Sequence, residues 1–129
     1  MLLNNNFFRF IKIYSLPRNC RLHKATEFTA IIKLKCQVSG DLIQIYTKPN
    51  ELAYARLGLI VSKKIERHAV KRNWIKRILR EAFRKSGRDD QTTRMDWVIR
   101  LRRPVTGKES IQLVTETNLL MLQLQQCRG

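Results

Sequence analysis

Four basic side chains recur at four-residue intervals in the middle of this chain: Arg72, Lys76, Arg80 and Arg84. In an α-helix, which turns 100° per residue, this spacing places them on one face, one above another. Guanidinium and ammonium groups in such a row bind phosphates through charge-assisted hydrogen bonds. A helix built only for solubility would alternate them with Glu, because like charges at this spacing repel. The row therefore predicts a surface that binds a polyanion, and we expect RNA.

The opposite face of the same segment is apolar. Six residues gather there: Trp74, Ile75, Ile78, Leu79, Ala82 and Phe83. From Lys63 to Arg88 the chain holds 11 Lys or Arg and only two acids, Glu66 and Glu81. The pattern predicts one amphipathic helix that closes near Gly87, with its apolar face in a core and its basic face toward phosphate.

The charge of the whole chain points to the same class of partner. Among 129 residues, 26 Lys and Arg against 10 Asp and Glu give a net charge of +16. That excess is ordinary for a nucleic-acid binder and extreme for an enzyme that acts on small molecules. No apolar run is long enough to span a bilayer, so we expect no membrane partner. Cys20, Cys36 and Cys127 have no paired spacing and fit thiols in a reducing compartment, which favours a cytoplasmic location.

Catalytic and metal-binding patterns are missing from the sequence. Asp89 and Asp90 are adjacent in a predicted loop and Asp96 begins a predicted strand, an arrangement more typical of turn formation than of metal ligation. His23 and His68 have no second ligand at metal spacing. We therefore expect no catalytic residue and no metal site on the protein, and place any catalytic groups on a partner.

The elements around the basic helix indicate a single compact α+β domain. A short helix is expected after Thr26, with Phe28, Ile31 and Ile32 on one side. Four segments with alternating or nearly alternating apolar residues predict strands: 34–39, 42–48, 55–62 and 95–101.

The last predicted helix follows a capping box formed by Thr106 and Glu109. Five of its residues are spaced to pack on the sheet: Ile111, Val114, Thr117, Met121 and Leu124. The predicted order is αβββαβα, around a central four-stranded sheet.

Three motifs resemble one known family. They are Arg56-Leu-Gly-Leu-Ile-Val-Ser-Lys-Lys64, Ala69-Val-Lys-Arg-Asn-Trp-Ile-Lys-Arg77 and Arg80-Glu-Ala-Phe-Arg84. Together with Leu16-Pro-Arg, Arg21-Leu and Glu27-Phe28 upstream, they resemble the bacterial ribonuclease P protein component over roughly residues 16 to 125. We assign residues 16–126 to this RNA-binding domain and expect residues 1–15 to be a flexible extension.

The resemblance implies a small accessory subunit of an RNA-catalysed endoribonuclease. In that family the protein joins a catalytic RNA, whose bound Mg²⁺ ions remove the 5′ leader from precursor tRNA. The resemblance also implies a left-handed crossover between the third and fourth strands, no cofactor bound by the protein alone and no required protein partner. The residues implied to bind the catalytic RNA are Lys71, Arg72, Asn73, Lys76, Arg77, Arg80 and Arg84.

The family also binds the single-stranded leader, in a cleft between its first helix and the sheet. Aromatic faces and cations hold single-stranded RNA. The candidates here are Phe28, Tyr46, Lys48, Lys63 and Lys64. Two interpretations stay open for Phe28, which is either a stacking surface or a core residue.

Trp74 departs from the family pattern, because it stands where the motif has a third basic residue. Its indole either stacks on a base or sugar or covers the edge of the core, and we favour the core edge.

Two other functions fit the charge and the helix pattern. One is a structural RNA-binding protein, such as a ribosomal protein, which would not stimulate tRNA 5′ processing. The other is a protein-only nuclease, for which alanine substitutions at Asp89, Asp90 and Asp96 would abolish activity.

Overall fold

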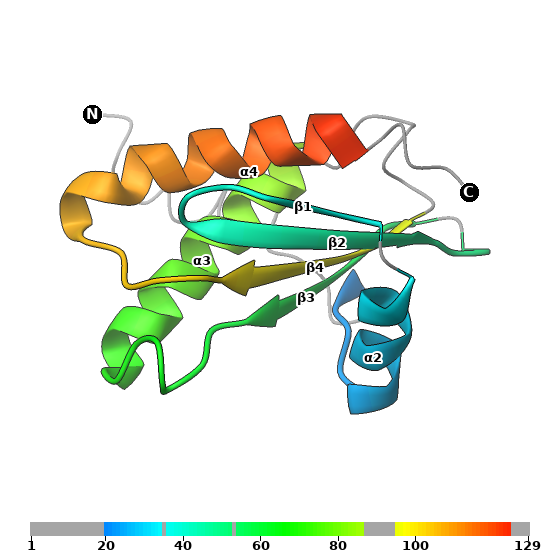
Figure 1. Cartoon of the computed structure of the whole chain (residues 1–129), viewed down its shortest axis with the longest axis horizontal. Helices are drawn as coiled ribbons and strands as arrows, with labels where there is room; N and C mark the ends of the chain where they lie inside the picture. The colour runs from blue at the N-terminus through cyan, green and yellow to red at the C-terminus, as the bar shows by residue number, and fades with distance from the viewer. Residues whose placement is uncertain (1–19, 35, 53, 87–94, 125–129) are drawn as a thin grey trace, which may run out of the picture.

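The computed structural model describes residues 20–34, 36–52, 54–86 and 95–124. The predicted order αβββαβα is confirmed within these residues (Figure 1). The elements are α2 (Ala25–Lys33), β1 (Gln37–Ser39), β2 (Ile43–Pro49), β3 (Arg56–Ile60), α3 (Ala69–Ser86), β4 (Met95–Leu101) and α4 (Ser110–Leu124). A short 3₁₀ turn, Gly107–Glu109, leads into α4 through the predicted capping box of Thr106 and Glu109.

The strands form one mixed sheet in the order β1-β2-β4-β3. β2 is antiparallel to both β1 and β4, whereas β3 runs parallel to β4. In Figure 1 the arrows of β3 and β4 point the same way, β4 lies above β3, and α3 lies behind the sheet. A chain that passes from β3 through α3 to β4 therefore turns in a left-handed sense, against the usual right-handed rule.

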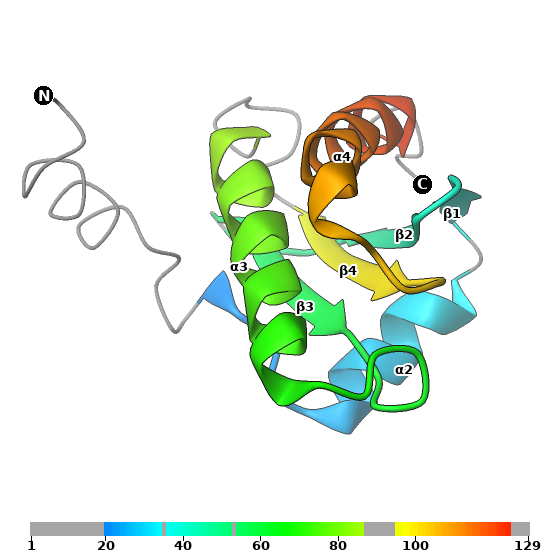
Figure 2. The same ribbon diagram turned by 90° about the vertical axis from the view of Figure 1, so that its left-hand side faces the viewer.

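The helices cover the two faces of the sheet unequally. α3 and α4 lie side by side on one face, and α2 lies on the other (Figure 2). The main apolar cluster fills the space between the sheet and the helix pair, and fully buried Trp97, Ile75 and Leu113 belong to it. A smaller cluster, which includes Ile31 and Tyr46, joins α2 to the other face.

The apolar face of the basic helix is where the pattern predicted it. Ile75, Leu79, Ala82 and Phe83 are buried. Trp74 and Ile78 are half-buried against the main cluster, so the prediction of Trp74 at the core edge is confirmed.

The helix α3 begins at Ala69, after a turn over residues 62–68 in which Glu66 N donates to Ser62 O at 3.0 Å. Two predictions about boundaries and packing need correction. The first strand is shorter than predicted, because Leu34 still caps α2. In α4 Ile111 is 78% exposed, and Leu113 and Leu120 take its place in the buried stripe.

The cysteines also differ from expectation. Cys20 is a free thiol, and partial burial raises its pKa. Cys36 is buried and disulfide-bonded, so the prediction of free thiols is wrong at this position.

Candidate nucleic-acid interface

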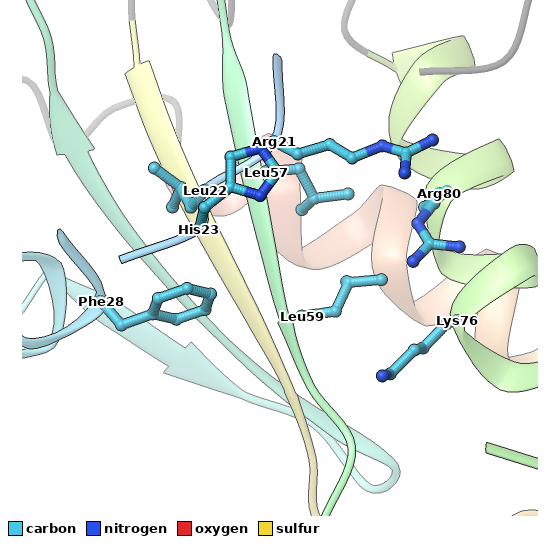
Figure 3. Close-up of a pocket in the computed structure, with 8 residues that line it drawn as sticks. All are labelled: Arg21, Leu22, His23, Phe28, Leu57, Leu59, Lys76 and Arg80. Carbon is cyan, nitrogen blue, oxygen red and sulfur yellow. The ribbon is translucent and has the colours of Figure 1, made fainter. Parts of the chain in front are cut away.

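A pocket of about 200 Å³ opens at the outer edge of β3, between α2 and α3 (Figure 3). Its walls come from three segments that are far apart in the sequence. They contribute Arg21, Leu22, His23 and Phe28 from the N-terminal side, Leu57 and Leu59 from β3, and Lys76 and Arg80 from α3. The entry segment, residues 20–24 before α2, is fixed to the sheet edge, because Leu22 N donates to Leu57 O at 2.8 Å.

One wall of the pocket is the aromatic ring of Phe28. The ring lies so close to Gly58 that a Cβ at this position would overlap it, so the approach requires glycine. Phe28 is half-buried, packs on the smaller cluster and also lines the pocket. Phe28 therefore covers part of the core and also presents part of its ring to the pocket, and its stacking on RNA stays a prediction.

The facing wall is cationic. Lys76 and Arg80 project from α3 toward the pocket, and Arg21 approaches from the entry segment (Figure 3). Partial burial lowers the pKa of Arg80, and the nearby charges of Arg21 and Arg77 lower it further. Arginine titrates so far above neutrality that the guanidinium stays charged. The described residues that line the pocket include no acid, so an anion there would relieve the repulsion.

The seven residues predicted to bind the catalytic RNA fall into two groups. Three are engaged within the protein: Lys71, Arg72 and Arg84. Lys71 Nζ lies 3.6 Å from Glu66 Oε1. Arg72 donates to the backbone oxygens of Glu66 and Arg67 at 2.9 and 3.0 Å. Arg84 pairs with Glu81 one turn earlier.

The other four have no hydrogen-bonded or ionic partner within the described residues: Asn73, Lys76, Arg77 and Arg80. Asn73 and Arg77 are exposed, whereas Lys76 and Arg80 line the pocket. Among the seven predicted residues, those in the middle of α3 are thus the ones whose side chains remain available to a ligand.

The five residues predicted to bind the leader do not meet at one place. Phe28 lines the pocket, but Tyr46 is only 5% exposed and its ring belongs to the smaller cluster. Lys48 is half-buried on β2. Lys63 and Lys64 are exposed in the turn after β3, where Lys64 lines a separate pocket.

Two polar residues of the pocket, Arg21 and His23, were not predicted from the sequence as site residues. Neither belongs to a periodic pattern, and both precede the first helix. The only signal was the Arg21-Leu pair among the motifs, which marked the segment without indicating a contact.

A cluster of ion pairs includes Glu27, the residue before Phe28. Arg56, the first residue of β3, lies between Glu27 of α2 and Asp96 of β4. Asp96 is 5% exposed and also accepts a hydrogen bond from Asn50 Nδ2 at 2.8 Å. This carboxylate is therefore engaged, and Asp89 and Asp90 lie outside the described residues.

The described residues show neither a metal-ligand cluster nor a membrane-spanning helix. They contain no group of three or more His, Cys, Asp or Glu side chains placed to hold a metal ion. No helix among them is long and apolar enough to cross a membrane.

Comparison with known proteins gives one consistent result. A family model described as Ribonuclease P matches residues 16–125. The ribonuclease P protein component of Nitrosomonas europaea is 41% identical over 109 residues, covering 84% of this chain and 90% of the relative. That of Nitrosomonas eutropha is 45% identical over 111 residues, with the same coverage.

Solved structures agree. The ribonuclease P protein of Staphylococcus aureus superimposes with a TM-score of 0.70 at 30% identity, covering 81% of this chain and 94% of the other. That of Thermotoga maritima gives a TM-score of 0.62 at 26% identity, covering 84% and 98%. Residues 1–15 lie outside the family match.

Proposed function

The chain belongs to the ribonuclease P protein family, and we propose that it binds two RNA partners with one continuous surface. The middle of α3 binds the catalytic RNA, through Asn73, Lys76, Arg77 and Arg80. Phe28, on the opposite wall of the pocket, stacks on the 5′ leader of precursor tRNA.

The family assignment sets the reaction. The chain is an RNA-binding accessory subunit of the ribonucleoprotein enzyme that matures the 5′ ends of tRNAs. The predicted α+β fold and the predicted family are both confirmed.

One observation carries the proposal about the partners. Phe28 and two cations of α3, Lys76 and Arg80, line the same pocket. An aromatic face provides sequence-tolerant stacking for an unpaired base, and cations hold the backbone. The pocket therefore suits a point where an unpaired strand meets a second, structured RNA.

We assign no catalytic group to the protein. In support, the carboxylates of Asp96 and Glu27 are bound to Arg56 and so are engaged within the protein. Mg²⁺ of the holoenzyme is held mainly by RNA in this proposal. The cations of the protein raise substrate affinity and lower the Mg²⁺ requirement by adding positive charge near the RNA.

The other residues predicted to bind the leader differ in exposure and are assigned different roles. Lys64 and Lys63 are exposed and serve as cations for the leader backbone, and Lys48 is a more distant one. Tyr46 supports the α2 side of the sheet from within the smaller cluster. The protein acts in the cytoplasm and needs no protein partner.

The test is 5′-end cleavage of a precursor tRNA at low millimolar Mg²⁺, with catalytic RNA alone, protein alone, and both together. Cleavage that is strong only in the mixture is the expected result. Cleavage by the protein alone would reveal a protein-only nuclease. Absence of stimulation would favour a structural RNA-binding role.

A further inference from the structure

Arg56 joins three elements through one guanidinium group. Its Nε and Nη2 donate to Asp96 Oδ1 and Oδ2 at 2.8 and 2.7 Å. Its Nη1 donates to Glu27 Oε2 at 2.9 Å. Arg56 and Asp96 are register partners in the parallel pair β3–β4, so the bidentate contact fixes the guanidinium on the sheet. The third contact then ties α2 to that fixed point.

Glu27 extends the connection to the pocket. Its Oε1 accepts hydrogen bonds from the backbone N of Lys24 at 3.1 Å and of His23 at 3.3 Å. The backbone contact from Lys24 is the main cause that lowers the pKa of Glu27, and Arg56 lowers it further. One carboxylate therefore holds the entry segment with its Oε1 and Arg56 with its Oε2. Phe28 is the next residue in the chain.

Apolar contacts also join α2 to the sheet. Ile31, Tyr46 and Val98 form the smaller cluster together with Leu22. Apolar contact is non-directional, so it holds α2 near the sheet without fixing its orientation. The Arg56–Glu27 contact is directional, but both side chains are about a quarter exposed. A pair with this exposure contributes little to global stability.

We infer that Arg56 is a positioning residue for substrate RNA. By holding Glu27, it sets the position of Phe28 and of the entry segment relative to the cations of α3, and so keeps the pocket in its binding geometry. The inference rests on the proposed function, because it concerns the wall of the pocket assigned to the leader.

The decisive variant is Arg56→Lys. A lysine ammonium keeps the positive charge but lacks the planar fork, so it cannot make the bidentate contact with Asp96 and hold Glu27 in the same geometry. We expect the affinity of the reconstituted holoenzyme for leader-bearing precursor tRNA to fall about tenfold, from loss of a well-placed stacking surface. Affinity for leaderless tRNA and for the catalytic RNA should change less than about twofold, which is within the scatter expected for a surface substitution.

The matched control is Arg103→Lys. Arg103 also bridges two carboxylates, with 2.7 Å contacts to Asp41 and Glu109. It lies outside this pocket, in the one that Lys64 lines, and the substitution keeps its positive charge there. Its loss should leave the preference for leader-bearing over leaderless substrate unchanged. An equal loss of that preference in both variants would show that any bridging arginine matters, and would overturn the inference.

A double-mutant cycle tests whether Arg56 acts through Glu27. Glu27→Gln keeps an oxygen for the backbone donors and removes the charge that Arg56 holds. If the contact is the mechanism, Arg56→Lys and Glu27→Gln together should weaken leader-dependent binding no more than either alone. Additive losses would overturn it. If Arg56→Lys fails to fold by circular dichroism, Glu27→Gln alone decides, and an unchanged leader preference refutes the inference.

The same experiment separates the two levels of interpretation. If the wild-type holoenzyme shows no preference for leader-bearing substrate, the proposed leader contact fails. If the wild type shows the preference and Arg56→Lys and Glu27→Gln both retain it, only the positioning role of Arg56 fails.

Discussion

The middle of α3 and its two ends carry the same kind of residue but present different chemistry. At the ends, Lys71, Arg72 and Arg84 bind Glu66, backbone oxygens and Glu81. In the middle, Lys76 and Arg80 face a pocket whose described residues include no acid. The sequence predicts one uniform basic row along this helix. In the structure, contacts with neighbouring residues engage the cations of that row near the ends and leave those in the middle available to a ligand. The count of cations in a sequence overstates the charge available to a ligand.

The largest effect is expected when cations in the middle of α3 are removed, and the same change at its ends provides the comparison. Lys76→Gln with Arg80→Gln should lower affinity for the catalytic RNA about 100-fold, at roughly tenfold for each lost charge-assisted contact. The slope of log affinity against log salt should become less negative by roughly 1.4 to 1.8. Filter binding across a salt series measures both.

The matched double variant is Lys71→Gln with Arg84→Gln. It removes the same formal charge, but from side chains that already have partners, and should cost less than about threefold. If the two double variants lose the same affinity for the catalytic RNA, the middle and the ends of α3 do not differ in RNA binding and this interpretation is wrong.

The second effect concerns the aromatic wall that faces the available cations. Phe28→Ala should cost about 1 to 3 kcal/mol of binding, seen only with substrates that carry a leader. Phe28→Tyr keeps a ring and should retain most of the affinity. Titration of leader-bearing and leaderless tRNA into the holoenzyme distinguishes this loss from a general one. A loss that is equal for both substrates would place Phe28 in the core alone.

The third prediction concerns Glu66, whose substitution would free Lys71 near the start of α3 for a ligand. Glu66 is 5% exposed, and its carboxylate accepts from His68 N at 3.1 Å as well as pairing with Lys71. Glu66→Gln should lower the free energy of unfolding by about 1 to 3 kcal/mol, because a buried charged acceptor is lost. Urea unfolding measures it. If RNA affinity rises at the same time, Lys71 has been released for binding; if it falls, the turn before α3 was needed to orient the helix.

The smallest expected effect concerns the carboxylate of Glu109, which pairs with Arg103 outside the pocket. Hydrogen bonds from Arg103 and from the backbone of Thr106 lower the pKa of Glu109 from 4.5 to about 2. Because the folded pKa is the lower one, this stabilisation is complete above the unfolded pKa and is lost as pH falls from about 4.5 toward 2. Thermal unfolding between these pH values should show a shallower decline in Glu109→Gln than in the wild type.

Most of the fold was predictable because it depends on local periodicity. The spacing of Ile75, Leu79 and Phe83 was sufficient to place the buried face of α3. The packing of α4 was less predictable, because apolar residues lie nearly all around it and only contact with the sheet selects Leu113 over Ile111. The position of β4 between β2 and β3 depends on pairing across the sheet, and the resemblance supplied the handedness of the crossover that places it there.

The site was harder to predict than the fold. Residue type identified Lys76, Arg80 and Phe28, but three segments must meet before they form one pocket. Tyr46 has the right chemistry for stacking, yet its place on β2 lies beneath α2. Arg56 belongs to the first motif, but its two carboxylate partners are 29 and 40 residues away, and no spacing rule connects them.

β4, one of the two central strands of the sheet, is the last of the described strands to be synthesised. β2 and β3 are not neighbours, because each pairs with β4. On a translating ribosome the sheet therefore cannot close until residues 95–101 have emerged, although the whole of α3 has been synthesised before them. For that interval the nascent chain carries its basic segment without the sheet and α4, against which the apolar side of α3 packs. Its first encounters with RNA are then governed by charge alone, and the specific surface exists only after translation has passed the final strand.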